Sequence, residues 1–303
     1  MTHAIRIHTP GGPEAMSWDE LDLAPPGPGE VRVRHTAVGL NYIDTYHRSG
    51  AYKLPLPSGL GQEAAGVVEA VGPGVTELEV GQRVAYGTGP IGAYSEQRNM
   101  PVDKLVPLPD GISDRDAAAM MLKGLTVQYL FRQTRKLNAG DTIVFHAAAG
   151  GVGLIACQWA KALGVRLIGT VSSDEKAALA KAHGCAETIV YTRENVVERV
   201  KALTGGKGVP VVYDGVGKDT WAASLDCLSP RGLFCLFGAS SGPVPPLDLQ
   251  LLAQKGSLFA TRPTLFSYAN TRESMIAMAN EMFDMLRAGK LKADIHQTFP
   301  LDR

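Results

Sequence analysis

The sequence predicts an α/β protein in which a β-rich region is followed by a doubly wound parallel sheet. The first observation is a strand–turn–helix signal in residues 142–156, where a short apolar run is followed by a turn of small residues. Apolar residues at helical spacing then continue over 152–160. The second is that further apolar runs at 166–171, 209–214 and 232–238 alternate with helical patterns. Such a sheet binds its ligand at the carboxyl ends of the strands.

The third observation is a series of short predicted strands in the first 110 residues. Residues 31–38 alternate apolar and polar side chains, which is typical of a half-buried strand. Further candidate strands are 64–72 and 82–86, and residues 1–7 form a first strand rather than a signal peptide. Turns rich in proline and glycine separate them, at 10–13, 25–29 and 72–74. This spacing predicts a compact, barrel-like domain.

The length of 303 residues suits two domains. A predicted helical region from Ser113 to about Thr134 leads from the first domain into the second. A later helix over 271–288 carries methionines expected in a core, and the tail 298–301 is expected to return to the first domain. The predicted boundaries are 1–122 with 263–303 for the first domain and 123–262 for the second.

The glycine turn departs from the common G-x-G-x-x-G pattern. Ala147 and Ala149 stand where glycine is usual, whereas Gly150 and Gly153 are present. Glycine lets the backbone approach a ligand closely, and the unpaired N–H groups at a helix start favour a phosphate. The alternative is a turn that only packs a helix against a strand. The strands that follow favour the nucleotide-binding interpretation.

The composition argues against several classes of protein. Lys and Arg number 30, as do Asp and Glu, so the formal charge of zero disfavours a polyanion as the main partner. No apolar run is long enough to cross a membrane, and the composition predicts a soluble globular chain. The four cysteines are scattered without a C-x-x-C pair. We expect buried thiols in a cytoplasmic protein rather than zinc ligands.

Three segments together resemble a known family. Residues 41–50 read Asn-Tyr-Ile-Asp-Thr-Tyr-His-Arg-Ser-Gly, residues 61–66 read Gly-Gln-Glu-Ala-Ala-Gly, and residues 146–164 hold the glycine turn and its helix. They are similar to the zinc-free, zeta-crystallin-like quinone oxidoreductases of the medium-chain dehydrogenase/reductase superfamily, and especially to bacterial NADPH:quinone reductases. The resemblance covers essentially the whole chain and implies a GroES-like catalytic domain and a Rossmann domain. Members usually continue beyond residues 299–301 with a helix and a strand, so we expect either a truncated chain or a first domain that lacks an edge.

The resemblance also implies chemistry without a metal. Zinc-dependent relatives place a cysteine near residues 38–44, a histidine in a Gly-His-Glu motif, and four clustered cysteines elsewhere. This chain has Asn41 and Gln62 in the first two places and no cysteine before Cys157. Because a catalytic zinc needs three protein ligands, we expect no metal site and interpret the histidines as surface or structural residues.

The end of the second parallel strand favours NADPH over NADH. Sites for NAD usually place an acidic residue there, whereas Ser172 stands nineteen residues after Gly153 and Lys176 follows one helical turn later. Hydroxyl and ammonium groups suit a 2′-phosphate. The acidic pair 174–175 is opposing evidence, unless it stabilises the helix N-terminus. Tyr191 can add a phenol hydrogen bond, which the resemblance supports.

Other cofactor contacts are implied mainly by the resemblance, and ordinary core packing is the alternative at Phe237 and Ala239. The predicted cofactor-binding residues are Asn41, Tyr46, Thr126, Gly150, Gly151, Val152, Gly153, Ser172, Lys176, Tyr191, Phe237, Gly238, Ala239, Ser240, Thr261 and Arg262.

The first domain holds the predicted catalytic residues. Hydride chemistry belongs to the nicotinamide, so the protein needs a flat slot and donors for the developing oxyanion. Asn41, Tyr46 and Tyr52 supply amide and phenol donors, and Asp44 and Arg48 could orient them. The alternative is that Asn41 closes a turn and Tyr46 packs in the interior.

The sequence therefore predicts a zinc-independent oxidoreductase that reduces small quinones with NADPH. One alternative is reduction of an activated double bond in an enone or alkenal, with Tyr46 or Tyr52 as proton donor. Another is a non-catalytic nucleotide-binding protein, crystallin-like or RNA-binding, which the zero charge disfavours. By analogy with the family we expect a homodimer paired through edge strands such as 233–237 or 258–261.

Overall fold

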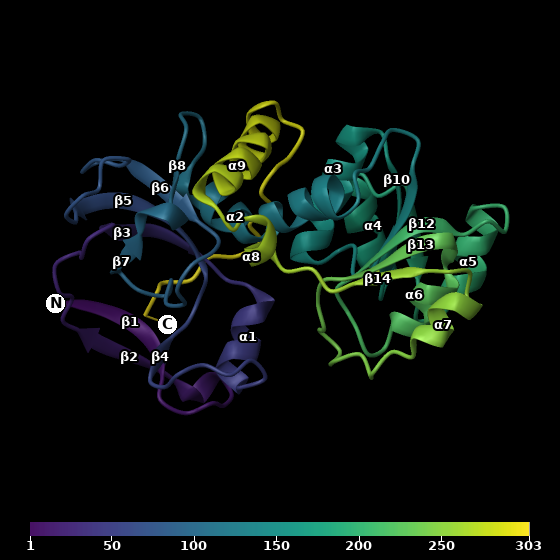
Figure 1. Cartoon of the computed structure of the whole chain (residues 1–303), viewed down its shortest axis with the longest axis horizontal. Coiled ribbons are helices and arrows are strands. Elements are labelled where there is room, and N and C mark those ends of the chain that lie inside the picture. The colour runs from purple at the N-terminus through teal and green to yellow at the C-terminus, as the bar shows by residue number, and fades with distance from the viewer. Residues whose placement is uncertain (303) are drawn as a thin grey trace. The chain divides into compact units, whose positions relative to one another are not determined.

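The computed structural model describes residues 1–302 and divides the chain into two compact units (Figure 1). Unit 1 comprises Met1–Thr126 and the C-terminal segment from Tyr268, and unit 2 comprises Val127–Ser267. Unit 1 is rich in antiparallel strands and unit 2 is built on one parallel sheet, so the predicted fold class is confirmed. No helix formed by residues 1–302 is both long and apolar enough to cross a membrane.

Unit 1 contains two antiparallel sheets. The larger has the order β7-β3-β5-β6-β8 and the smaller β2-β1-β4, and an isolated bridge joins Ala4 to Ser95. Alternation explains β3, because Val31 and Val33 lie in the core while Arg34 is exposed. The strands are β1 (Thr2–Ile7), β2 (Met16–Leu21), β3 (Glu30–Gly39), β4 (Ser58–Gly59), β5 (Glu63–Val71), β6 (Arg83–Tyr86), β7 (Gln97–Pro101) and β8 (Val106–Pro107).

Two helices of unit 1 begin at polar side-chain caps. In α2 (Asp114–Tyr129), the Ser113 hydroxyl accepts the Asp116 N–H at 3.0 Å, as expected for an N-cap. Thr271 caps α9 (Arg272–Arg287), in which Met275, Met278 and Met282 are buried as predicted. Gly124 permits close packing, because a Cβ there would collide with Met282. The other helices of this unit are α1 (Tyr42–Ser49) and the 3₁₀ turns η1 (Pro13–Ala15) and η2 (Val102–Lys104), and α8 (Leu265–Tyr268) spans the unit boundary.

Unit 2 is a six-stranded parallel sheet in the order β11-β10-β9-β12-β13-β14. The chain moves outward from β9 to β11 and then returns to the other side of β9, so the order reverses between β9 and β12. The strands are β9 (Thr142–Phe145), β10 (Arg166–Val171), β11 (Glu187–Val190), β12 (Val209–Asp214), β13 (Leu228–Leu236) and β14 (Phe259–Thr261). The helices are α3 (Gly151–Leu163), α4 (Asp174–Ala182), α5 (Val196–Leu203), α6 (Trp221–Asp226) and α7 (Leu249–Gln254), and a π-helical turn, η3 (Leu130–Thr134), follows α2.

One predicted edge strand is wrong. Residues 233–237 lie mainly in β13, which pairs with β12 on one side and with β14 on the other. The short strand β14 takes the outer position, so β13 has no free edge among the described residues. The second predicted edge, at 258–261, does form the border of the sheet, and the Phe259 side chain is 61% exposed there.

Candidate active site

The glycine turn of unit 2 connects β9 to α3 at the reversal of the strand order. Gly150 is the N-cap of α3, and no side chain caps this helix. A Cβ on Gly153 would overlap the carbonyl oxygens of Ala147 and Ala148, so the helix can approach the strand only with glycine at this position. Ala147 adopts the left-handed backbone with φ of 55° at a place where glycine is usual. Open helix N–H groups beside a glycine fit a pyrophosphate.

The residues predicted to bind a 2′-phosphate follow two neighbouring strands. Ser172 comes directly after β10 and Tyr191 directly after β11, and the last residues of these strands, Val171 and Val190, are paired. The Tyr191 side chain is 53% exposed, and Lys176 is exposed in the first turn of α4. These side chains therefore gather at one end of the sheet, where they fit a phosphate dianion.

An ion pair that sequence reasoning missed lies at the same end of the sheet. Arg193 donates to both carboxylate oxygens of Asp174, at 2.8 and 2.5 Å. Asp174 belongs to the acidic pair that argued against NADPH in the sequence. The guanidinium of Arg193 neutralises its charge and holds the pKa of Asp174 below its ordinary value. Both side chains are exposed, so the pair adds little to stability.

The remaining predicted residues of unit 2 lie after β13 and at the end of β14. The Phe237 and Gly238 N–H groups donate to the Asp214 carbonyl at 2.8 and 3.3 Å, which continues the pairing beyond β13. The Phe237 ring lies 5.4 Å from the Phe145 ring, so core packing accounts for part of its role. Four further predicted residues follow at this end of the sheet or in the segment after β14: Ala239, Ser240, Thr261 and Arg262.

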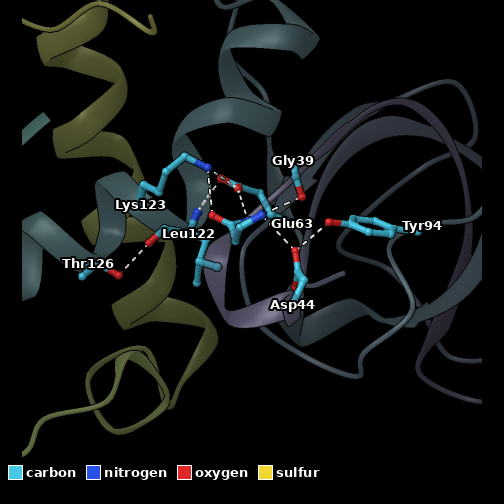
Figure 2. Close-up of polar contacts among 8 residues, drawn as sticks. Gly39, Asp44, Glu63, Tyr94, Leu122, Lys123 and Thr126 are labelled. Carbon is cyan, nitrogen blue, oxygen red and sulfur yellow. Dashed lines mark hydrogen bonds and ion pairs between the residues drawn. The ribbon is translucent and has the colours of Figure 1, made fainter. Parts of the chain in front are cut away.

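In unit 1, Asn41, Glu63 and Lys123 form a buried polar group, which we call the Lys123 cluster (Figure 2). Glu63 Oε2 accepts the Asn41 amide at 2.7 Å and the Lys123 ammonium at 2.9 Å, and Oε1 accepts the Leu122 N–H at 2.7 Å. The Lys123 ammonium also donates to Asn41 Oδ1 at 2.9 Å. Glu63 is fully buried and the Lys123 side chain is 18% exposed. A buried carboxylate requires such pairing, so the cluster fixes a cation in place.

Asp44 adjoins this cluster from the first turn of α1. Its Oδ2 accepts the Asn41 backbone N–H at 2.9 Å and the Tyr94 hydroxyl at 2.7 Å (Figure 2). Burial raises the pKa of Asp44 to about 6, although the hydrogen bond from Tyr94 acts in the opposite direction. Its Oδ1 has no hydrogen-bond partner within residues 1–302. Asp44 was expected to orient the predicted catalytic side chains, and the contact that it makes with Asn41 is to the backbone.

The predicted catalytic tyrosines form an aromatic surface on and after α1. The Tyr46 ring lies 5.3 Å from Tyr42 and 5.1 Å from Tyr52. Tyr42 and Tyr52 are 60% and 37% exposed, so the surface can receive a flat ring. Arg48 instead donates to the Gly11 carbonyl at 3.3 Å, so its observed contact supports a loop rather than a tyrosine.

Two further predicted positions have modest local roles. The Thr126 hydroxyl donates to the Leu122 carbonyl of its own helix at 2.7 Å. Gln62 is buried, and its Oε1 has no hydrogen-bond partner in the described part of the chain. No group of three or more His, Cys, Asp or Glu residues within 1–302 could hold a metal ion.

Sequence reasoning missed Glu63, Tyr94 and Lys123 as site residues. Glu63 directly follows Gln62, and Lys123 precedes Thr126 by about one helical turn, which gives a weak signal for each. The sequence does not show that these residues lie close together, because Glu63 comes from β5, Lys123 from α2 and Tyr94 from the segment before β7.

A second buried network supports the turn of unit 2. His146 contacts the Thr170 hydroxyl at 2.9 Å and the Ser224 hydroxyl at 3.0 Å, and Ser224 donates to Asp214 at 2.7 Å. Serine here stands between the carboxylate and the imidazole, and all three groups are buried. That order is not the nucleophile–base–acid order of a hydrolase, so we interpret the network as structural.

Comparison with known proteins gives two family matches. Residues 27–110 match the "Alcohol dehydrogenase GroES-like domain" family, and residues 151–286 match the "Zinc-binding dehydrogenase" family. The first match lies in unit 1, and most of the second lies in unit 2.

Individual relatives match over nearly the full chain. A quinone oxidoreductase of Pseudomonas aeruginosa is 61% identical over 302 residues, covering 99% of this chain and 93% of the relative. A 2-haloacrylate reductase of a Burkholderia species is 46% identical over 311 residues, covering 99% of this chain and 92% of the relative. The crystal structure of the Escherichia coli quinone oxidoreductase complexed with NADPH has a TM-score of 0.95 at 51% identity, covering 97% of this chain and 90% of that one.

Proposed function

The chain belongs to the quinone oxidoreductases of the medium-chain dehydrogenase/reductase superfamily, and we propose that it is an NADPH-dependent enzyme that reduces small quinones. The observation that carries the proposal is 61% identity to a quinone oxidoreductase over 99% of the chain. The uncapped start of α3 at Gly150 supports it, because its N–H groups can bind the pyrophosphate of the cofactor. The Lys123 ammonium also supports it, because a fixed cation can stabilise negative charge on the reduced substrate.

Unit 2 holds the cofactor in this proposal. NADPH supplies a hydride when it is bound. The backbone of 150–153 binds the pyrophosphate, and Ser172, Lys176 and Tyr191 bind the 2′-phosphate. The NADPH in the related Escherichia coli structure supports this choice. Because the 2′-phosphate is a dianion near neutral pH, an exposed ammonium beside it favours NADPH over NADH.

Unit 1 binds the quinone in this proposal. Tyr46 and Tyr52 offer an aromatic surface on which a flat ring stacks, and their phenols can donate to its oxygens. Asn41 and Gln62 stand where zinc-dependent relatives have metal ligands, and amides are poor ligands for zinc. We therefore assign the stabilisation of negative charge to hydrogen-bond donors.

Steady-state oxidation of NADPH by 1,4-benzoquinone tests the proposal, with NADH as the comparison cofactor. Rapid turnover with NADPH and little with NADH is expected. Equal use of both cofactors would contradict the assignment of the phosphate-binding residues. NADPH binding without quinone reduction would contradict the proposed activity and would favour a non-catalytic nucleotide-binding role.

A second candidate substrate is an activated alkene. It is favoured by the 46% identical relative named 2-haloacrylate reductase. Reducing such a double bond requires a donor at the conjugated carbonyl and a proton for carbon, which Tyr46 or Tyr52 can supply. Parallel assays with 2-chloroacrylate and 1,4-benzoquinone distinguish the two classes, because a quinone reductase gives the higher kcat/KM with the quinone.

We also propose a cytoplasmic homodimer. The edge strand β14 supports the dimer, since its free backbone groups and exposed Phe259 can pair with a second copy. The four cysteines are free and buried, which is typical of a reducing compartment. Fractionation of the native host with antibodies against this chain tests the location, and recovery with membranes or in the periplasm would contradict it.

A further inference from the structure

The Lys123 ammonium offers a fixed positive charge that the predicted catalytic set did not include. We propose that Lys123 is a catalytic residue that donates a hydrogen bond to the quinone oxygen as negative charge develops there. Asn41 and Glu63 act as its positioning residues. The inference rests on the proposed quinone reduction and adds the group that stabilises the reduced substrate.

The hydrogen bonds of Lys123 leave one donor unused. An ammonium has three N–H donors, and two of them bind Asn41 Oδ1 and Glu63 Oε2, each at 2.9 Å. No other acceptor for Lys123 exists within residues 1–302. The Lys123 side chain is 18% exposed, whereas Asn41 and Glu63, which anchor it, are buried. The third N–H is therefore available to a substrate oxygen.

Asn41 is engaged within the cluster. Its Oδ1 faces the ammonium, and its Nδ2 donates to Glu63 Oε2 at 2.7 Å and to the Gly39 carbonyl at 3.4 Å. The reversed amide would place an NH₂ group against the ammonium and an oxygen against the carboxylate, so the charges set its orientation. Both side-chain N–H groups of Asn41 already have acceptors. Lys123 is therefore a better candidate than Asn41 for the hydrogen-bond donor to the oxyanion.

The chemistry explains why a fixed cation helps. NADPH gives up a hydride with its electron pair and becomes NADP⁺, and an O–H bond forms at one quinone oxygen, so the negative charge develops on the other oxygen. Water then gives that oxygen a proton and leaves hydroxide, and the product is the neutral hydroquinone. A donor already aimed at that oxygen stabilises the charge without reorganising. Glu63 and Asn41 preorganise Lys123, since they hold two of its three N–H groups.

Single-turnover kinetics of the Lys123→Met variant with bound NADPH and 1,4-benzoquinone provide the test. We expect hydride transfer to slow by about 10²–10³-fold, while the Kd of NADPH stays unchanged. We expect Lys123→Arg to retain more of the rate, because arginine keeps the charge and the donors. The slope of log rate against quinone reduction potential should steepen in Lys123→Met, which a merely structural role would not cause.

The double variant Lys123→Met/Glu63→Gln keeps the test decisive if the single variant does not fold. It removes both charges together, so no unpaired carboxylate remains buried. Hydride transfer should stay slow in this variant. A folded double variant that transfers hydride at the wild-type rate would overturn the assignment of Lys123.

A binding measurement separates this inference from the proposed function. The NADP⁺-loaded wild-type protein should bind 4-nitrophenol as its phenolate and lower the pKa of the bound phenol, and Lys123→Met should abolish that change. If wild type reduces no quinone, the proposed function fails. If wild type reduces quinones but the variants match it in both rate and phenolate binding, only the role of Lys123 fails.

Discussion

At the scale of single residues, Lys176 is expected to decide between the two nicotinamide cofactors. It is exposed in the first turn of α4, close in sequence to Ser172, which directly follows β10. We expect Lys176→Ala to raise the Kd of NADPH by about 10–100-fold, the value of one charge-assisted hydrogen bond, and to leave the Kd of NADH unchanged. Fluorescence titration with both cofactors checks this. Lys181→Ala, on the same helix, is the matched control, and equal weakening by both variants would contradict the assignment.

His35 gives unit 1 a dependence of stability on pH. Its Nδ1 contacts the Ser95 carbonyl at 2.6 Å and its Nε2 the Tyr86 hydroxyl at 2.8 Å, and burial lowers its pKa to about 4. The unfolded chain, with a histidine pKa near 6.5, takes up a proton first as the pH falls. Stability is therefore lost between pH 6.5 and 4, by about 2 kcal/mol at pH 5. Denaturant unfolding at pH 7 and pH 5 should show a smaller difference for His35→Gln than for wild type.

Asp44 is the control, because its contribution has the opposite sign. Its pKa is raised to about 6 in the folded protein, so its stabilising effect is complete below the unfolded pKa and is lost as the pH rises through 6. Lowering the pH from 7 to 5 restores part of that stability in wild type. Asp44→Asn removes this gain, so the variant should lose more stability over the same range than wild type does. Identical pH dependence in both variants would contradict these roles.

At the scale of elements, the N-cap glycine of α3, Gly150, and the glycine in its first turn, Gly153, are expected to have separable roles. A Cβ on Gly153 would overlap two backbone carbonyls, whereas a Cβ on Gly150 would lie 3.2 Å from the Ala147 oxygen. We expect Gly153→Ala to destabilise unit 2 by about 2 kcal/mol or more, since backbone must move. Gly150→Ala should fold with little loss but bind NADPH more weakly, because the methyl group lies where the pyrophosphate approaches. Thermal unfolding and NADPH titration of both variants separate the two roles.

At the scale of the whole molecule, the exposed edge of the parallel sheet is expected to determine assembly. β14 borders the sheet, and Phe259 there is 61% exposed. We expect Phe259→Lys to shift the protein from a dimer toward the monomer mass of 32.2 kDa in sedimentation equilibrium, because a charge on an edge strand opposes strand pairing. Phe266→Lys, at a residue of α8 that is 48% exposed, should leave the dimer intact. A monomeric wild type would contradict the proposed dimer.

The parallel sheet was predictable because its signals are local. Apolar runs of six residues matched β10 and β12 at their observed bounds, and helical spacing after the glycines predicted α3. The placement of Ser172 and Tyr191 at the same end of the sheet was also predictable, since residues that follow adjacent parallel strands lie at one end of a sheet. The strands that lie at the edges of the sheet were harder to predict, because the order of strands depends on pairing across the whole unit.

The sequence by itself determined the fold class and the glycine turn, since periodicity and turn chemistry act over a few residues. It also supplied the side chains that we propose for the 2′-phosphate. Only the tertiary structure brought Asn41, Glu63 and Lys123 together, across separations of 22 and 60 residues. Burial then decided their roles. A carboxylate removed from water must find cations and N–H donors, and satisfying Glu63 fixes the position of the Lys123 ammonium.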